Sequence, residues 1–239
     1  TELLTVAPKG GGRFQPKPYT LLQKACERFV CFPRGLGLAL GFTVTKTLCV
    51  SGEPLNPDLP NISLRPYQRA AVDSVCARLS AGPVAGGLLV ASCGAGKTVM
   101  GLEIVRRLGR RAAVVVHKDF LMQQWAARIR QFLPGAKVGI VQRDVAEVDG
   151  CDIVLCMIQT LAARAGLHSK LASIGIVLYD ETHHICAKSF CKSLSLFPAR
   201  MRLGLTATPD RADGLGDLVT WMVGPVVCRV RRRPGVTSQ

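Results

Sequence analysis

Six short apolar runs recur along the chain from about residue 61 onward, and stretches with helical spacing separate them. The runs span residues 84–91, 112–117, 137–141, 152–156, 174–179 and 201–206. Runs of this length, rich in Val, Leu and Ile, are typical of strands that are buried on both faces of a parallel sheet. Their alternation with helical stretches predicts an α/β fold, in which helices cover both faces of a mainly parallel sheet.

Two of the helical stretches have clear boundaries. One begins at Pro66, and its apolar positions step by four from residue 67 to residue 79, which places Gln68 near the helix start with its side chain exposed. The second begins after Gly96 and ends at Gly109, a residue that suits a C-terminal cap. Because this second helix follows the run 84–91, the sequence predicts a strand, a glycine-rich turn and a helix in that order.

The first 60 residues differ in composition from the rest. Glycines at 10–12 and prolines at 16 and 18 favour a loose start, and the stretch 52–60 holds three further prolines. Clusters of glycine and proline mark turns and linkers. We therefore expect residues 1–60 to form a small appendage and a linker, and residues 61–239 to form the α/β domain.

The predicted turn after the first strand has the chemistry of a phosphate-binding loop. The segment from Ala91 to Thr98 reads ASCGAGKT, a relaxed form of a pattern that strictly begins with glycine. Its two glycines permit a backbone path that points N–H groups inward, and the helix start adds its positive dipole end. Lys97 is expected to neutralise the β- and γ-phosphates of a nucleotide, and the Thr98 hydroxyl to ligate Mg²⁺.

An acidic pair stands at the end of another predicted strand. Asp180 and Glu181 follow the run 174–179, and ligands of open α/β sheets bind at the carboxyl ends of strands. An aspartate there can hold Mg²⁺ through its water shell, and the next carboxylate can orient or deprotonate the attacking water. Two solvated carboxylates are the alternative, which the phosphate-binding turn upstream disfavours.

Polar residues near these strand ends suggest further roles. His183 and His184 follow the acidic pair, and two cysteines lie close by, but no Cys-x-x-Cys pair occurs in the sequence, which disfavours zinc. We expect His183 to couple the magnesium site to the next strand and His184 to be a packed neighbour. Thr206 and Thr208 end the last run and place two hydroxyls beside the nucleotide, a signal that is weak by itself.

Charge and composition limit the class of protein. The 239 residues are 48% hydrophobic and carry a formal net charge of +15, most of it after residue 62. Such a charge favours binding to a polyanion, because Lys and Arg release counterions from a phosphate backbone. The arginines at 229 and 231–233 fit either a contact with nucleic acid or a solvated charge run. Trp125 is expected in the core rather than in a base-stacking platform.

The same composition bears on the cellular setting. No apolar run approaches the about 18 residues of a membrane span, so no membrane partner is expected. Ten cysteines without disulfide-like spacing, in a chain with a nucleotide site, predict a reducing intracellular setting. Nucleus, cytoplasm and virion are not distinguished by the sequence.

In chain order, the motifs resemble those of the superfamily 2 helicases and translocases with an Asp-Glu-x-His motif. The branch they resemble contains the XPB-like DNA helicases and their relatives in large DNA viruses, including transcript-release helicases. The matching segments are residues 64–68 (adenine-reading motif), 91–98 (motif I), 116–125 (motif Ia), 157–161 (the next contact motif), 180–184 (motif II) and 204–214 (motif III and the stretch after it).

This resemblance implies the first RecA-like lobe of an ATP-dependent DNA helicase or translocase, a P-loop NTPase fold that uses ATP and Mg²⁺. The implied catalytic residues are Lys97, Asp180, Glu181 and His183. Those implied to bind the nucleotide are Gln68, Gly94, Ala95, Gly96, Lys97, Thr98 and Asp180, with Thr98 and Asp180 holding Mg²⁺ through water. Thr206 and Thr208 are implied in coupling, and Lys118, Gln159 and Arg211 in nucleic-acid contact.

The family also needs a second RecA-like lobe whose arginines complete the ATP site. This chain starts at Thr1 and stops at Gln239 without such a lobe, so we expect a fragment that is nearly inactive alone. The Asp-Glu-x-His pattern of motif II, together with Arg211, favours double-stranded DNA over RNA as the partner. Two rival functions stay open, a motor subunit of a restriction-type nuclease and a nucleotide-dependent clamp or sensor that binds nucleic acid without unwinding it.

Overall fold

The computed structural model describes residues 5–6, 19–20, 23–26, 29–31, 33–41, 47–182, 187–208 and 216–230. One sheet contains β5 (Ala85–Ala91), β6 (Ala112–Val116), β7 (Val138–Gln142), β8 (Val145–Ala146), β9 (Ile153–Met157), β10 (Ile176–Asp180), β11 (Met201–Thr206) and β12 (Val226–Val230). The strand order is β12-β5-β11-β10-β6-β9-β7-β8. All neighbouring strands are parallel except β7 and β8, which form an antiparallel hairpin at one edge. The expected α/β fold with a mainly parallel sheet is confirmed.

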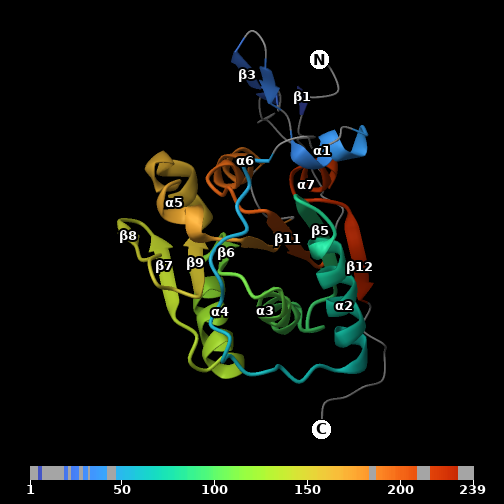
Figure 1. Ribbon diagram of the computed structural model, residues 1–239, viewed down its shortest axis with the longest axis vertical. Helices are drawn as coiled ribbons and strands as arrows, with labels where there is room; N and C mark the ends of the chain where they lie inside the picture. Colours follow the sequence, from blue (N-terminus) through green and yellow to red (C-terminus); the bar gives the residue numbers. More distant parts are fainter. Residues whose placement is uncertain are drawn as a thin grey trace, which may run out of the picture.

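Helices cover both faces of this sheet (Figure 1). One face carries α2 (Pro66–Ser80), α3 (Lys97–Leu108) and α4 (Asp119–Phe132), and the other carries α1 (Arg34–Ala39), α5 (Ile158–Ala163), α6 (Ala187–Ser195) and α7 (Gly216–Met222). Two 3₁₀ turns, η2 (Ala165–Leu167) and η3 (Lys170–Ser173), precede β10. No helix in the described ranges has both the length and the apolar character needed to cross a bilayer.

Two apolar clusters lie on either side of the sheet, and the strand pleat explains them. Successive side chains of a strand point to opposite faces. Val114 of β6 packs with α2, α3 and α4 residues in one cluster, whereas its neighbour Val115 packs in the other. Because both faces are covered, the central strands are apolar throughout, which is why the sequence showed continuous runs rather than alternation.

The short elements near the N-terminus lie apart from the sheet. β1 (Thr5–Val6) pairs with β2 (Tyr19–Thr20), and β3 (Gln23–Cys26) pairs with β4 (Phe29–Cys31), both antiparallel. Helix α1 approaches α7 so closely that a Cβ on Gly35 would lie 2.5 Å from the carbonyl oxygen of Trp221. Helix α1, in the segment expected to be an appendage, therefore contacts α7 on the face of the sheet that also carries α5 and α6.

The proline-rich stretch 52–60 is not a free linker, in contrast to the interpretation of its composition. Leu55 and Leu59 are buried in the apolar cluster formed with α2 and α3. The backbone N–H of Glu53 donates to the Ser173 carbonyl at 2.8 Å, and its carbonyl accepts from the N–H of Arg111 at 2.9 Å. The prolines disfavour a helix in this segment, but the apolar residues between them pack it against the α/β domain.

Candidate nucleotide-binding site

The glycine-rich turn between β5 and α3 has the predicted backbone path. Gly94 and Gly96 have φ angles of 76° and 87°, a left-handed conformation that favours glycine. Helix α3 begins at Lys97, directly after Gly96. The Lys97 ammonium donates to the carbonyl of Ala91 at 3.3 Å, so it folds back over the turn. This arrangement places the helix N-terminus and a lysine at one point, as phosphate binding requires.

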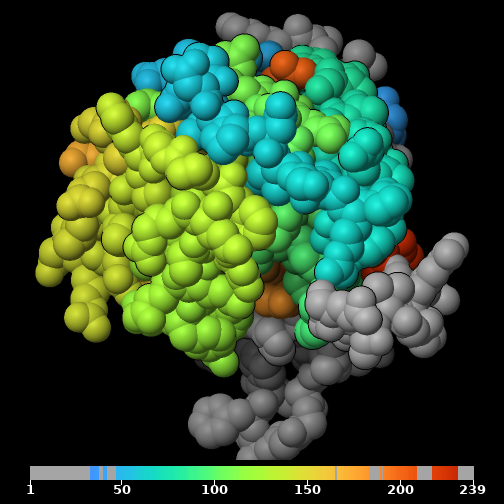
Figure 2. Space-filling model, turned by 90° about the horizontal axis from the view of Figure 1, so that it is seen from below, coloured from blue at the N-terminus to red at the C-terminus, as the bar shows by residue number. Residues whose placement is uncertain are grey.

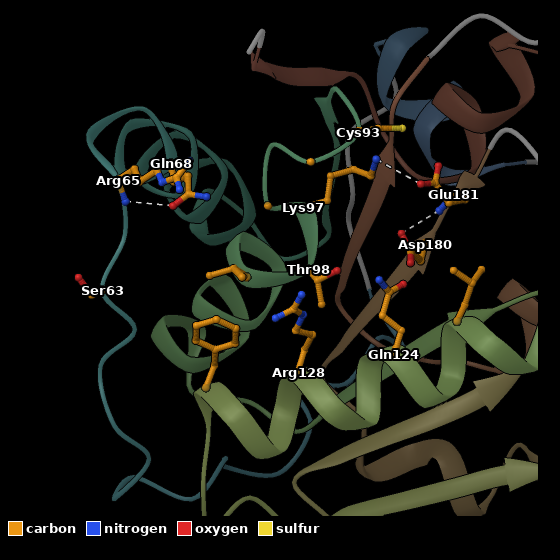
Figure 3. A pocket seen from close by; sticks show the side chains of 15 residues that line it. Ser63, Arg65, Gln68, Cys93, Lys97, Thr98, Gln124, Arg128, Asp180 and Glu181 are labelled. Carbon is orange, nitrogen blue, oxygen red and sulfur yellow. Dashed lines mark hydrogen bonds and ion pairs between the residues drawn. The ribbon is translucent and has the colours of Figure 1, made fainter. Parts of the chain in front are cut away.

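The acidic pair lies at the end of β10, next to this turn. Asp180 is the last residue of the strand and is 6% exposed, and the Glu181 carboxylate lies 3.2 Å from the Lys97 ammonium (Figure 3). Glu181 has a φ of 48°, which is rare outside glycine. Non-glycine residues in such conformations concentrate at functional sites. The ion pair joins the start of α3 to the residue that follows β10.

Burial raises the pKa of the Asp180 carboxyl above its usual value, and the nearby Glu181 charge raises it further. Hydrogen bonds and the Lys97 charge act in the opposite direction. The main one comes from Trp125, whose indole N–H donates to Asp180 Oδ2 at 2.8 Å. The backbone N–H of Glu181 donates to the other oxygen, Oδ1, at 3.0 Å. Both carboxylate oxygens thus have a donor that fixes their direction.

Trp125 lies in the core, as the sequence predicted, and it also contacts the acidic pair. It is 1% exposed, so the expected core position is confirmed. Its hydrogen bond to Asp180 was not predicted. Only a general rule could have predicted this bond, namely that a buried indole N–H usually finds a hydrogen-bond acceptor. No other residue type in α4 combines such a large side chain with a single hydrogen-bond donor.

Gln68 corrects a second expectation, because its side chain is buried rather than exposed, with 7% exposure. Its amide donates to the Ala95 carbonyl at 3.1 Å and accepts from the Arg65 N–H at 3.0 Å. Its neighbour Tyr67 is exposed, at 40%. The start of α2 is thereby attached to the phosphate-binding turn. One N–H and one lone pair of the Gln68 amide remain available.

The glycine-rich turn, Gln68 and the acidic pair line a pocket of about 490 Å³. Figure 2 shows α2 and α4 facing each other across a hollow in the surface. Helix α4 contributes Gln124 and Arg128, which point toward Thr98 and the acidic pair, and the loop before α2 contributes Ser63 and Arg65 (Figure 3). The contributions of α4 were not predicted, since exposed polar residues of a helix carry no signal of their direction in a single sequence.

The residues present fit a magnesium nucleotide. The turn offers backbone N–H groups at a helix start, Lys97 a cation, and Thr98 and Asp180 oxygens on the same pocket wall. Among the described residues no cluster of three His, Cys, Asp or Glu side chains could hold a metal. His183 and His184 lie outside the described residues, so the role expected for His183 is untested.

The other candidate residues that the structure describes lie at the same edge of the sheet. Thr206 ends β11 and is buried, and its hydroxyl donates to the carbonyl of the exposed Thr208 at 2.6 Å. Gln159 at the start of α5 donates to the His117 carbonyl at 3.0 Å, which brings it beside the exposed Lys118. Arg211 lies outside the described residues. The structure thus brings Lys118 and Gln159 together, and their contact with nucleic acid stays a prediction.

Comparisons with known proteins agree with this geometry. A family model described as type III restriction enzyme, res subunit, matches residues 61–211. A protein of Acanthamoeba polyphaga mimivirus that carries the name of an ATP-dependent RNA helicase is 31% identical over 72% of this chain and 33% of its own length. The DNA 3'-5' translocase XPB2 of Sulfurisphaera tokodaii is 32% identical over 70% of this chain and 36% of its own length. The chain therefore spans about a third of these relatives.

Solved structures share the fold at lower identity. The UvsW helicase of Bacteriophage T4 has a TM-score of 0.65 at 15% identity, covering 94% of this chain and 90% of that chain. The SWI2/SNF2 ATPase core of Sulfolobus solfataricus in complex with dsDNA has a TM-score of 0.56 at 20% identity, covering 71% and 37%. The chain belongs to the family of the type III restriction enzyme res subunit, within the superfamily 2 helicases whose first-lobe motifs it carries.

Proposed function

We propose that this chain is the ATP-binding lobe of an ATP-dependent DNA helicase or translocase, which couples ATP hydrolysis to movement on nucleic acid. The observation that carries the proposal is the shared pocket in which Lys97, the first residue of α3, lies 3.2 Å from Glu181, the residue after β10. A phosphate-binding lysine and a carboxylate for water activation are the two parts that phosphoryl transfer to water requires. Residues 61–239 are proposed as the lobe itself.

The two carboxylates are proposed to have different roles. Asp180 is buried and held by Trp125 and a backbone N–H, which suits a fixed ligand. Together with the Thr98 hydroxyl it would hold Mg²⁺, which supplies charge neutralisation for the phosphates when bound. Glu181 is more exposed than Asp180, and its partner Lys97 would turn to the phosphates when the nucleotide binds. Glu181 would then be available to orient and deprotonate the attacking water.

The test separates ground-state binding from catalysis. Lys97→Ala is expected to abolish binding of a fluorescent ATP analogue, because the lysine contacts the phosphates before reaction. Glu181→Gln is expected to retain binding and lose hydrolysis, because the carboxylate acts on the water only in the transition state. Lys170→Ala, an exposed lysine of η3, is the matched control and leaves both unchanged. Equal loss of binding in the Lys97 and Glu181 variants contradicts this division of roles.

The proposed partner is nucleic acid, with double-stranded DNA favoured over RNA. Several relatives are named DNA helicases or translocases, and one solved neighbour is a complex with dsDNA, although the mimivirus relative is named for RNA. Lys118 and Gln159 are proposed to contact the phosphate backbone. We expect affinity to fall linearly with salt on logarithmic axes and to depend little on sequence. Preference for one sequence, or affinity that ignores salt, contradicts a backbone contact.

A second RecA-like lobe is proposed to complete the ATP site. Arginines supplied to a transferring phosphoryl group are worth roughly 10³–10⁵ in rate, so this chain alone is expected to hydrolyse ATP poorly and to unwind nothing. Adding the second lobe is expected to restore DNA-stimulated turnover. A restriction-type motor is less supported, because the curated relatives carry the names of helicases and translocases. Strand displacement by the longer protein separates a helicase from a clamp that only binds.

A further inference from the structure

Two non-glycine residues in the described part of the chain have a left-handed backbone conformation. One is Glu181 with a φ of 48°, and the other is Arg143 with a φ of 52°. Arg143 lies in the turn between β7 and β8, where glycine would adopt this conformation without strain. Residues that keep such a conformation are concentrated at functional sites. The position of Glu181 in the nucleotide site has an explanation, whereas that of Arg143 has none yet.

Helix α5 and the residue after it hold the backbone of Arg143 in place. Its N–H donates to the Thr160 hydroxyl at 2.9 Å, and its carbonyl accepts from the Arg164 guanidinium at 3.0 Å. Thr160 is buried, so this anchor is rigid. The Arg143 guanidinium itself is exposed and has no hydrogen-bond or ion-pair partner among the described residues. The turn thus fixes an arginine whose charge is directed to solvent.

The turn also belongs to the edge that carries Lys118. Strands β6, β9 and β7 are parallel neighbours, so their carboxyl ends lie along one edge (Figure 1). The Gln142 amide donates to the Asp119 carboxylate at 2.7 Å, and the Gln123 amide donates to its other oxygen at 2.9 Å. Asp119 is therefore held by two neutral amides and keeps its charge, and Asp144 of the same turn is also exposed. The edge thus carries both signs, and its exposed cations Lys118 and Arg143 are the groups on it that can meet a phosphate.

We propose that Arg143 contacts a phosphate of the nucleic acid and extends the binding surface from the Lys118 loop across the β7–β8 hairpin. The inference rests on the proposed function, because it names a further contact of the same substrate. The fixed backbone of the turn removes the backbone part of the ordering cost, and the planar guanidinium can form two parallel hydrogen bonds to the phosphate oxygens. A rigid turn with a merely solvated arginine is the outcome that the test must exclude.

The variant Arg143→Gly separates an effect on DNA binding from an effect on folding. A phosphate contact predicts a loss of DNA affinity, whereas a merely solvated arginine predicts none. Glycine relieves the left-handed backbone, so the melting temperature is expected to stay the same or rise by about 2–4 °C. Affinity for a duplex DNA oligonucleotide at about 0.1 M salt is expected to fall about 5–10-fold, and the slope of log affinity against log salt to decrease by about 0.9. Fluorescence anisotropy of the labelled duplex at several salt concentrations gives both quantities.

Two controls complete the experiment. Arg143→Lys keeps the charge and the left-handed backbone, and is expected to retain most of the affinity and the full salt slope. Arg78→Ala removes an equal charge from the exposed face of α2, near its C-terminal end, and is expected to leave the slope unchanged. If Arg143→Gly behaves like Arg78→Ala while the unaltered chain binds DNA, this inference is overturned and the proposed function stands. If the unaltered chain does not bind DNA at all, both are overturned.

Discussion

Replacing Gly96 with alanine tests how the start of α2 supports the phosphate-binding turn. A Cβ on this glycine would lie 2.4 Å from the Gln68 amide nitrogen, a distance that real Cβ atoms do not adopt. The atom in the way is the end of a flexible side chain, so Gln68 is expected to move rather than the backbone. It then gives up its bonds to the Ala95 carbonyl and the Arg65 N–H.

The expected cost has two parts. Alanine at a φ of 87° adds about 1–2 kcal/mol of backbone strain. Two lost hydrogen bonds add about 0.5–1.5 kcal/mol each. Gly96→Ala should therefore lower the free energy of unfolding by about 2–5 kcal/mol, a large part of the 5–15 kcal/mol typical of a domain. Gly109→Ala is the matched control, because Gly109 has a φ of 62° and its Cβ would meet nothing within 4 Å.

Urea denaturation of the two glycine variants measures these parts separately. Gly109→Ala should show the backbone strain alone, and the excess in Gly96→Ala should be about 1–3 kcal/mol. In a background with Gln68→Ala that excess should vanish, because no amide remains to be displaced. Equal costs for the two glycine variants, or an excess that persists without Gln68, would refute the contact as the source of the effect.

Two further substitutions test the core around the site. Trp125→Phe keeps an aromatic ring but removes the donor to Asp180, so the free energy of unfolding should fall by about 1–2 kcal/mol. Titration with Mg²⁺ should show that nucleotide binding requires a higher Mg²⁺ concentration. An unchanged requirement contradicts the positioning role of Trp125. Glu103→Gln should cost about 2–3 kcal/mol in urea denaturation, because the buried carboxylate binds Arg106 and Arg107. Burial raises the Glu103 pKa, but these bonds together lower it below 4.5, so its stabilisation is present above about pH 4.5 and is lost as pH falls through the folded value. The glutamine variant should lack this part of the acid transition.

The central sheet was predictable because burial on both faces restricts the residue types of each strand by itself. A strand buried on both faces must be apolar at nearly every position, so the run that became β10 was evident without any knowledge of its neighbours. The phosphate-binding turn was predictable for a similar reason, since two glycines with φ above 70° at Gly94 and Gly96 leave a clear signature. β8 and β12 were missed because an edge hairpin of two residues and a half-exposed strand carry little pattern.

What the sequence could not show depends on contacts between distant segments. Gln68 was expected to be exposed because helical spacing assigned that face to solvent, but the Ala95 carbonyl 27 residues away provides a partner for its amide. The segment 52–60 was interpreted as a linker from its prolines, yet its leucines find a core that only the folded sheet creates. A polar side chain at the end of a helix can be buried when another segment of the chain offers it a hydrogen-bond partner. The spacing of apolar residues within the helix does not reveal that segment.

The two carboxylates of motif II show how environment can assign roles to adjacent residues of nearly the same chemistry. Asp180 is 6% exposed, its pKa is raised by burial, and both of its oxygens accept a hydrogen bond, so it has little freedom to move. Glu181 lies one residue further on, past the end of the strand, in a left-handed backbone conformation and paired with the Lys97 ammonium. A fixed carboxylate suits a ligand whose geometry must be constant, and a carboxylate held by a displaceable cation suits a group that must change partners during turnover. The division of labour proposed for this pair thus follows from where β10 ends.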